Sequence, residues 1–347
     1  MFDAFLPTQL DDFVRIRREA DPRIASATRL MIGPWAHAQT VTFPGGLTPR
    51  NYRLESFVPS VAWFDEHLQV SGTAFPQTAP VRLYVMGEHV WRDEHEWPLA
   101  RTSYTPYYFH SAGKANTLAG DGILTRERPT QQEPPDTYVY APYDPVPTAG
   151  GTAIGPSAGI ALQNTLETRP DVLVYTTAPL EEDLEVTGPL QLVLYVSTTA
   201  PNTDFTAKLV DVHPDGAAYN VSEGILRRSY NRPNGTVGAT HPTKTRVDLW
   251  PTSMVFFKGH RLRLEVSSSN YPRFDRNPNT GRPIATETQP IVATQTVHHG
   301  RETPSHVILP IIPRQRVANL RLTHRMTCEG FLNGLFLVWS LRYPTIG

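Results

Sequence analysis

The chain has 347 residues, and its 32 Lys and Arg against 33 Asp and Glu give a formal net charge of −1. A chain this close to neutral lacks the basic field that holds a nucleic-acid backbone. It contains no apolar run of about 18 residues, the length that would predict a membrane span. Its single cysteine, Cys328, excludes an internal disulfide framework and a cysteine-based zinc site. The lack of disulfides favours the cytoplasm without assigning a compartment.

The first elements are typical of the closing part of an α/β layer. Residues 1–7 have neither the charged nor the apolar region of a signal peptide, which is typical of the interior of a longer protein. A helix is expected over residues 8–19, with Thr8 as its cap. Residues 29–32 predict a buried strand, for which no partner strand is evident. Residues 59–68 predict a second helix with an apolar side to bury.

The sequence after about residue 75 predicts many short strands. The chain's 33 prolines and 23 glycines favour turns and short strands over long helices. Alternating or β-branched segments recur with turn clusters between them, which favours an all-β sandwich, most simply a jelly roll. Residues 111–168 are expected to be long loops around short strands. The expected strands are residues 81–86, 105–109, 171–177, 190–197, 206–212, 224–229, 245–249 and 261–267.

His37 is a candidate general base. It follows the strand at residues 29–32, and a loop just past a strand end is where an α/β-hydrolase places its histidine. Such a base needs a carboxylate to orient its imidazole, and Asp3 precedes it with one helix between them. Acid before histidine is also the chain order of an α/β-hydrolase. The alternative is that His37, one of 12 histidines, lies in an ordinary loop.

Ser157 matches the text of a nucleophile elbow but not its context. The segment Gly155-Pro156-Ser157-Ala158-Gly159 has the G-x-S-x-G spacing. The elbow needs a strand before the serine and a helix after it, whereas this serine follows a loop rich in Pro and Gly. It also comes after both Asp3 and His37, which is the wrong order. We therefore do not expect Ser157 to be the nucleophile.

Several pairs of histidine and aspartate residues have side chains that can bind a metal ion. Adjacent histidines on a strand face opposite sides of it, and the other pairs lack a convincing third ligand. We therefore expect no metal site and no cofactor. The pairs are His298 with His299, His89 with His95, and Asp211 with His213.

Segments in both halves of the chain match, in order, the motifs of one enzyme family. In the first half they are Phe2-Asp3-Ala4-Phe5, Gly33-Pro34-Trp35-Ala36-His37 and Trp63-Phe64-Asp65-Glu66-His67-Leu68. In the second half they include Asp211-Val212-His213-Pro214-Asp215-Gly216, Gly259-His260-Arg261-Leu262-Arg263 and Ser267-Ser268-Ser269-Asn270-Tyr271-Pro272-Arg273-Phe274-Asp275-Arg276-Asn277. On these residues the chain resembles the cocaine esterase/X-Pro dipeptidyl-peptidase (CocE/NonD) family of serine hydrolases, over residues 1 to about 313.

The resemblance implies a mainly β chain with a Ser-His-Asp triad that is incomplete. Asp3 would be the catalytic acid and His37 the base, whereas the family's serine elbow and oxyanion-hole tyrosine lie upstream of the acid and are missing here. Residues 1–75 would be the last strand and helices of an α/β-hydrolase domain. Residues 76–313 would be a C-terminal jelly-roll, galactose-binding-like sandwich. Residues 314–347 match nothing in the family and form an atypical tail, either a docked helix or a non-native extension.

The expected function is that of the C-terminal part of a serine ester or amide hydrolase, of the acyl-hydrolase or X-Pro dipeptidyl-peptidase type. The isolated chain should be inactive because the nucleophile is absent. The alternative is a stand-alone β-sandwich that binds or scaffolds without catalysis. The substrate of the intact enzyme would be a small ester or a peptide, which the sequence does not tell apart. No nucleic-acid or membrane partner is expected, and a homodimer is left open.

Overall fold

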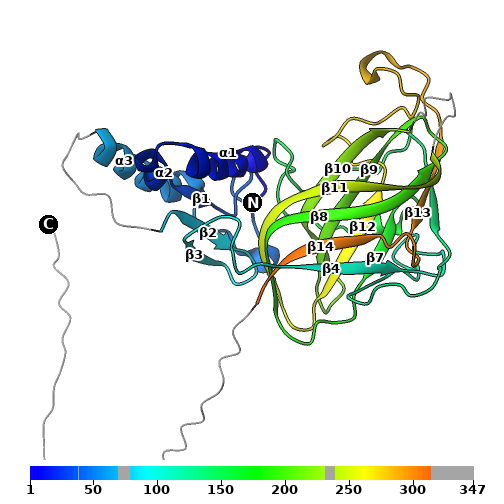
Figure 1. Cartoon of the computed structure of the whole chain (residues 1–347), viewed down its shortest axis with the longest axis horizontal. Coiled ribbons are helices and arrows are strands. Elements are labelled where there is room, and N and C mark those ends of the chain that lie inside the picture. Colours follow the sequence, from blue (N-terminus) through cyan, green and yellow to red (C-terminus); the bar gives the residue numbers. More distant parts are fainter. Residues whose placement is uncertain (38, 69–78, 231–238, 314–347) are drawn as a thin grey trace, which may run out of the picture. The chain divides into compact units, whose positions relative to one another are not determined.

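The structure is a computed structural model that describes residues 1–37, 39–68, 79–230 and 239–313 (Figure 1). Its first elements are α1 (Leu6–Glu19), α2 (Pro22–Ala27), β1 (Leu30–Ile32), the 3-10 turn η1 (Pro44–Gly46) and α3 (Tyr52–Leu68). The expected tail at residues 314–347, with Cys328, lies outside the described residues. Within the described ranges, the helices are too short or too polar to cross a bilayer.

α1 begins earlier than predicted. Pro7 occupies one of its first two positions, where the missing N–H of proline breaks no helical hydrogen bond. The N-cap residue is Phe5, with no side-chain cap hydrogen bond, so the prediction that Thr8 caps this helix is wrong. The helix buries one side, which consists of Leu6, Leu10 and Phe13.

α3 also begins earlier than predicted, and its apolar side is exposed. Asn51 Oδ1 accepts a hydrogen bond from the Arg53 N–H at 2.9 Å, which caps the helix well before Pro59. The expected burial is not observed, because Val61 and Phe64 are 57% and 55% exposed. No segment among the described residues covers this side of the helix.

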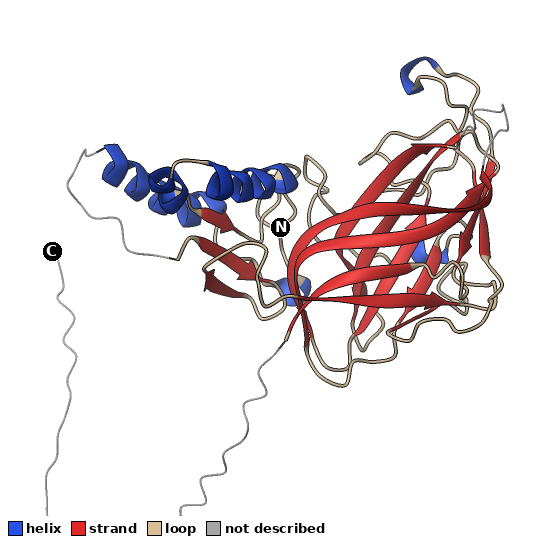
Figure 2. Cartoon of the chain, in the orientation of Figure 1, coloured by secondary structure: helices blue, strands red, loops and turns tan. Residues whose placement is uncertain are grey.

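β1 belongs to a three-stranded sheet in the order β1-β2-β3 (Figure 2). β2 (Val81–Val85) runs parallel to β1, with Leu30 opposite Val81, and β3 (Val90–Glu94) is antiparallel to β2. The expectation that residues 29–32 have no partner strand is therefore wrong. The partner strand, β2, comes after α3 in the sequence. The alternating pattern of residues 81–86 predicts a strand there, but one that belongs to the sandwich.

The remaining strands make the chain mainly β, as predicted. Each strand expected after residue 100 is present, and several are longer than expected because they continue through polar residues, many of which are buried. The strands are β4 (Ser103–His110), β5 (Ile123–Thr125), β6 (Asp136–Tyr140), β7 (Leu173–Thr176), β8 (Leu184–Thr198), β9 (Asn202–Val212), β10 (Ala218–Ser229), β11 (Ala239–Phe256), β12 (Arg261–Ser267), β13 (Ala293–His298) and β14 (His306–Ile312), with 3-10 turns η2 (Leu166–Thr168) and η3 (Ile284–Thr286) between them.

These strands form one hydrogen-bonded path that curls into a jelly-roll sandwich (Figures 1 and 2). The path runs β10-β9-β12-β7-β5-β4-β14-β8-β13-β6, and β11 also pairs with β8. β5 joins its two halves, because it is antiparallel to β4 and parallel to β7, where Ile123 lies opposite Thr176. The largest fully buried side chains of the sandwich include Phe109, Tyr140, Tyr175, Phe205 and Phe256.

Candidate active site

The segment that carries Asp3 runs beside the loop that carries His37. Phe2 and Ala36 form a parallel bridge, in which the Phe2 N–H donates to the Trp35 carbonyl at 3.0 Å. Phe2 and Ala36 are both buried. Because these two apolar residues are fixed side by side, the polar residue that follows each of them is brought to the same place.

Asp3 and His37 are in contact at the distance expected of an acid–base pair. Asp3 Oδ2 lies 3.2 Å from His37 Nδ1, and Asp3 Oδ1 accepts a hydrogen bond from the Phe5 N–H at 2.8 Å. The Phe5 ring packs edge-on against the imidazole, with ring centroids 5.1 Å apart. The His37 and Asp3 side chains are 41% and 31% exposed, so the pair is accessible from solvent.

His37 Nε2 is the ring nitrogen that does not face Asp3. Among the described residues it has no hydrogen-bond partner, whereas Nδ1 faces the carboxylate. A carboxylate in this position favours the tautomer with the proton on Nδ1 and the lone pair on Nε2. The pair can therefore take a proton from a hydroxyl group brought to Nε2 and return it later.

Ser157 is not on a nucleophile elbow. Residues 152–158 form turns and bends, with neither a strand before the serine nor a helix after it. The loop is closed by two hydrogen bonds between Gly151 and Gly159, at 2.7 Å and 2.8 Å, and the Ser157 side chain is exposed. The structure therefore lacks the geometry that the G-x-S-x-G text requires.

The adjacent histidines at the end of β13 have different partners, as their alternation predicts. His298 Nε2 lies 2.9 Å from Ser197 Oγ. His299 is fully buried between two carboxylates, with Nδ1 3.0 Å from Glu133 Oε2 and Nε2 2.9 Å from Asp136 Oδ2. Both nitrogens of His299 are thus occupied by protein groups, which gives this histidine a structural role.

The pair Asp211 and His213 has the third neighbour that the sequence analysis did not find. His260 Nδ1 lies 2.9 Å from Asp211 Oδ1, and His213 Nε2 lies 3.3 Å from Asp211 Oδ2. The expectation that this pair lacks a third ligand is therefore wrong. The available signal is that Asp211 lies near the end of one predicted strand and His260 directly precedes another. Only the register between those strands brings them together.

Comparison with known proteins identifies the family. Residues 73–308 match the family described as the X-Pro dipeptidyl-peptidase C-terminal non-catalytic domain. The chain is 41% identical to cocaine esterase from Rhodococcus sp. over 327 residues, which cover 90% of this chain and 55% of the relative.

Solved structures show the same fold. An α-amino acid ester hydrolase matches with a TM-score of 0.70 and 27% identity, over 86% of this chain and 52% of the other. An aminopeptidase from a marine sediment Thaumarchaeota archaeon matches with a TM-score of 0.70 and 25% identity, over 86% and 51% of the two chains. The chain thus spans about half the length of these proteins. Since the matched domain covers more than half of this chain, the chain belongs to the X-Pro dipeptidyl-peptidase C-terminal domain family. Its similarity to cocaine esterase and to the amino acid ester hydrolase makes it a C-terminal portion of a CocE/NonD-family protein.

Proposed function

We propose that this chain supplies the acid and the base of a serine ester or amide hydrolase, and that the nucleophilic serine lies on polypeptide outside this sequence. The observation that carries the proposal is the 3.2 Å contact between Asp3 Oδ2 and His37 Nδ1, which leaves Nε2 available. The family supports the same class of reaction, since the similar proteins include an esterase and an amino acid ester hydrolase.

In this mechanism His37 moves the proton and Asp3 holds His37 in place. As the serine oxygen attacks the acyl carbon, His37 Nε2 takes the hydroxyl proton and then delivers it to the leaving alcohol or amine. Asp3 keeps the proton on Nδ1 and stabilises the imidazolium that forms. A water molecule, activated by the same nitrogen, then hydrolyses the acyl-enzyme and releases the acid.

The exposed apolar side of α3 supports the proposal that further polypeptide packs against this helix. Leu54, Val58 and Phe64 are 69%, 69% and 55% exposed, and they line a groove of about 1010 Å³ with Leu30 and Met31 of β1. Monomeric proteins rarely expose a large contiguous apolar surface. We propose that the polypeptide that carries the serine packs in this groove, which would account for the greater length of the relatives.

The sandwich itself is assigned no catalytic step. Residues 73–308 match a domain described as non-catalytic, and Asp3 and His37 both lie outside that range. This observation favours the alternative, a binding or scaffold module, for the sandwich considered alone. The choice between ester and peptide substrates belongs to the part of the enzyme that would contact the acyl group.

Labelling of the isolated chain with a fluorophosphonate probe tests whether it contains a nucleophile. The chain is expected to remain unlabelled, and the Ser157→Ala variant should behave identically. Stoichiometric labelling that Ser157→Ala abolishes would show that Ser157 is a nucleophile and would overturn the proposal.

A chimera tests the roles of Asp3 and His37. This chain would be joined to the part of the Rhodococcus cocaine esterase that it does not match, and hydrolysis of a simple aryl ester would be measured. His37→Ala should lower kcat by about 10³-fold or more, because triad residues act as a unit. Asp3→Asn should lower kcat by a similar order, because it favours the wrong tautomer. Ser157→Ala is the matched control and should be fully active. A folded chimera whose activity survives His37→Ala would contradict the proposal.

A further inference from the structure

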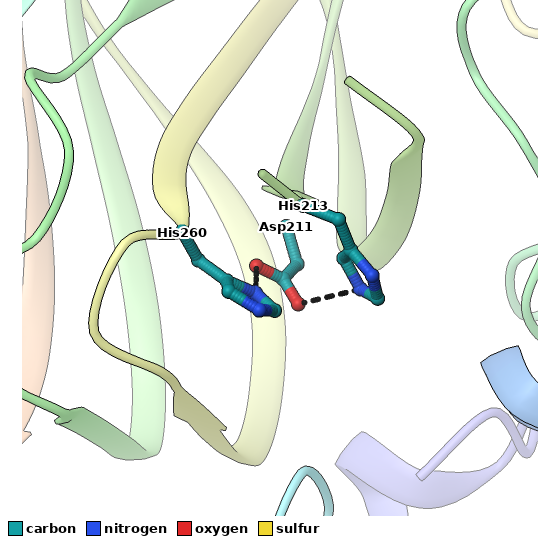
Figure 3. A group of neighbouring side chains, drawn as sticks. All are labelled: Asp211, His213 and His260. Atoms are coloured by element: carbon teal, nitrogen blue, oxygen red, sulfur yellow. Dashed lines mark hydrogen bonds and ion pairs between the residues drawn. The ribbon is translucent and has the colours of Figure 1, made fainter. Parts of the chain in front are cut away.

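Three potential metal ligands meet at one end of the sandwich. Asp211 is near the end of β9, His213 directly follows β9, and His260 directly precedes β12. β9 and β12 are antiparallel neighbours in which Leu262 lies opposite Asp211. The end of β9 and the start of β12 therefore lie side by side at the same end of the sheet. This arrangement brings the three side chains together (Figure 3).

The carboxylate of Asp211 lies between the two imidazole rings (Figure 3). Oδ1 is 2.9 Å from His260 Nδ1 and Oδ2 is 3.3 Å from His213 Nε2. The Asp211 side chain is 3% exposed, against 13% for His260 and 26% for His213. A ligand atom from each of the three residues lies within 4.8 Å of the other two.

We propose that Asp211, His213 and His260 bind a divalent transition-metal ion of the zinc type. Two imidazoles and one carboxylate form a ligand set that suits zinc, with each ligand atom about 2.0–2.2 Å from the ion. Tetrahedral ligands at that distance are roughly 3.3–3.6 Å from one another. The present N–O separations of 2.9 Å and 3.3 Å approach this range, so small side-chain movements would open the site to an ion.

The surroundings leave room for a fourth ligand. The three side chains line a cavity of about 230 Å³, whose other walls include Phe2, Phe43 and Met86. A water molecule in this cavity could complete a four-coordinate site, because three protein ligands leave one position open. The buried carboxylate of Asp211 would offset part of the charge of the ion.

The expected effect of a bound ion is on the stability of the fold. Its ligands come from the end of β9, the turn after β9 and the turn before β12. Phe2, the residue before Asp3, lines the same cavity. A bound ion would link the two turns and stabilise this end of the sandwich, next to the segment that carries Phe2 and Asp3. The proposal does not depend on the catalytic roles of Asp3 and His37, and its test needs no enzymatic activity.

The test uses the untagged chain after treatment with a chelator. Zn²⁺ binding would be measured by titration calorimetry, metal content by mass spectrometry and stability by thermal unfolding. We expect one ion per chain and a higher Tm with Zn²⁺ present. Co²⁺ in place of Zn²⁺ should give the visible absorption of a four-coordinate site.

Variants locate the ion. Loss of a residue that only hydrogen-bonds to a metal ligand typically weakens metal binding by about 10- to 100-fold. His213→Gln and His260→Gln remove a ligand itself, so each should weaken Zn²⁺ binding by more than this. Each should also abolish the rise in Tm. His67→Gln is the control, because His67 is an exposed histidine of α3 that does not line this cavity. It should bind Zn²⁺ as the unaltered chain does. Sub-stoichiometric binding by the unaltered chain would overturn the proposal, and so would binding that persists in both ligand variants.

Discussion

Leu30 on β1 lies opposite Val81 on β2 in a parallel pair. This pairing joins the segment that carries Asp3 and His37 to the first strand of the region that matches the C-terminal domain. The expected boundary between residues 75 and 76 thus has strands of one sheet on both sides. The short strand β1 consequently has a hydrogen-bonded neighbour, although only on one side among the described residues.

Hydrogen exchange should rank the two kinds of strand. β12 has neighbours on both sides, β9 and β7, whereas β1 pairs only with β2 in the described part of the chain. Native-state amide exchange should therefore show weaker protection for Leu30–Ile32 than for Arg261–Ser267. Equal protection of the two strands in a monomer would contradict this ranking.

The sequence pattern predicted individual elements better than the pairing between them. Residues 261–267 were predicted with the bounds that β12 has, because their apolar alternation is a local property. The partner of β1 and the approach of His260 to Asp211 depend on pairing between segments far apart in the sequence, which no local pattern encodes. The contact between Asp3 and His37 is expected from the position of His37 just past a strand, from the chain order of acid before histidine and from the family resemblance. The exposure of the apolar side of α3 is not predicted from the sequence, because burial depends on a covering segment.

Replacement of His299 should cost much stability. His299 is buried between Glu133 and Asp136, as described above, so its removal leaves two carboxylates without their shared partner. Although burial alone would raise the pKa of Asp136, hydrogen bonds from His299 and its other donors keep that pKa below the usual range. We expect His299→Ala to lower the free energy of unfolding by about 3–5 kcal/mol, measured by urea denaturation.

The control for His299 is its neighbour His298. This side chain is partly exposed, and its contact with Ser197 Oγ involves no charged partner. His298→Ala should lower the free energy of unfolding by about 1 kcal/mol. Similar losses in the two variants would show that His299 does not bridge the carboxylates.

Glu265 should make the stability of the chain depend on pH. It lies buried opposite Lys208, whose Nζ donates to Gln163 Oε1 at 2.9 Å. Burial raises the pKa of Glu265 from 4.5 to about 8, although the charge of Lys208 acts against this rise. Between pH 4.5 and about pH 8, Glu265 holds a proton in more of the folded chains than of the unfolded chains. The free energy of unfolding should therefore fall as the pH rises, by at most about 1.4 kcal/mol per pH unit.

Glu265→Gln isolates this contribution, because it keeps the shape of the side chain and removes the titration. Urea unfolding would be measured for both proteins from pH 5 to pH 9, a range chosen to bracket the raised pKa of about 8. The difference in the free energy of unfolding between them should change in favour of the variant up to about pH 8 and level off above it. A difference that does not change with pH would mean that Glu265 is ionised in the folded chain.

Gly224 should tolerate no side chain, because β10 approaches β11 closely at this position. An added Cβ would lie 1.8 Å from the Asp248 carbonyl oxygen, which belongs to the backbone and has little room to move. Ser222 Oγ also donates to the Leu249 carbonyl and holds the two strands together here. We expect Gly224→Ala to lower the free energy of unfolding by about 3 kcal/mol or more.

The control for Gly224 separates crowding from backbone strain. Gly216 has a φ of +90° in the turn after β9, and nothing lies within 4 Å of an added Cβ. Gly216→Ala should therefore cost only the strain of a left-handed conformation, about 1–2 kcal/mol. If thermal and urea unfolding gave Gly224→Ala the smaller loss of the two, β10 and β11 could separate at this point without cost, and the close packing of that edge of the sandwich would have to be revised.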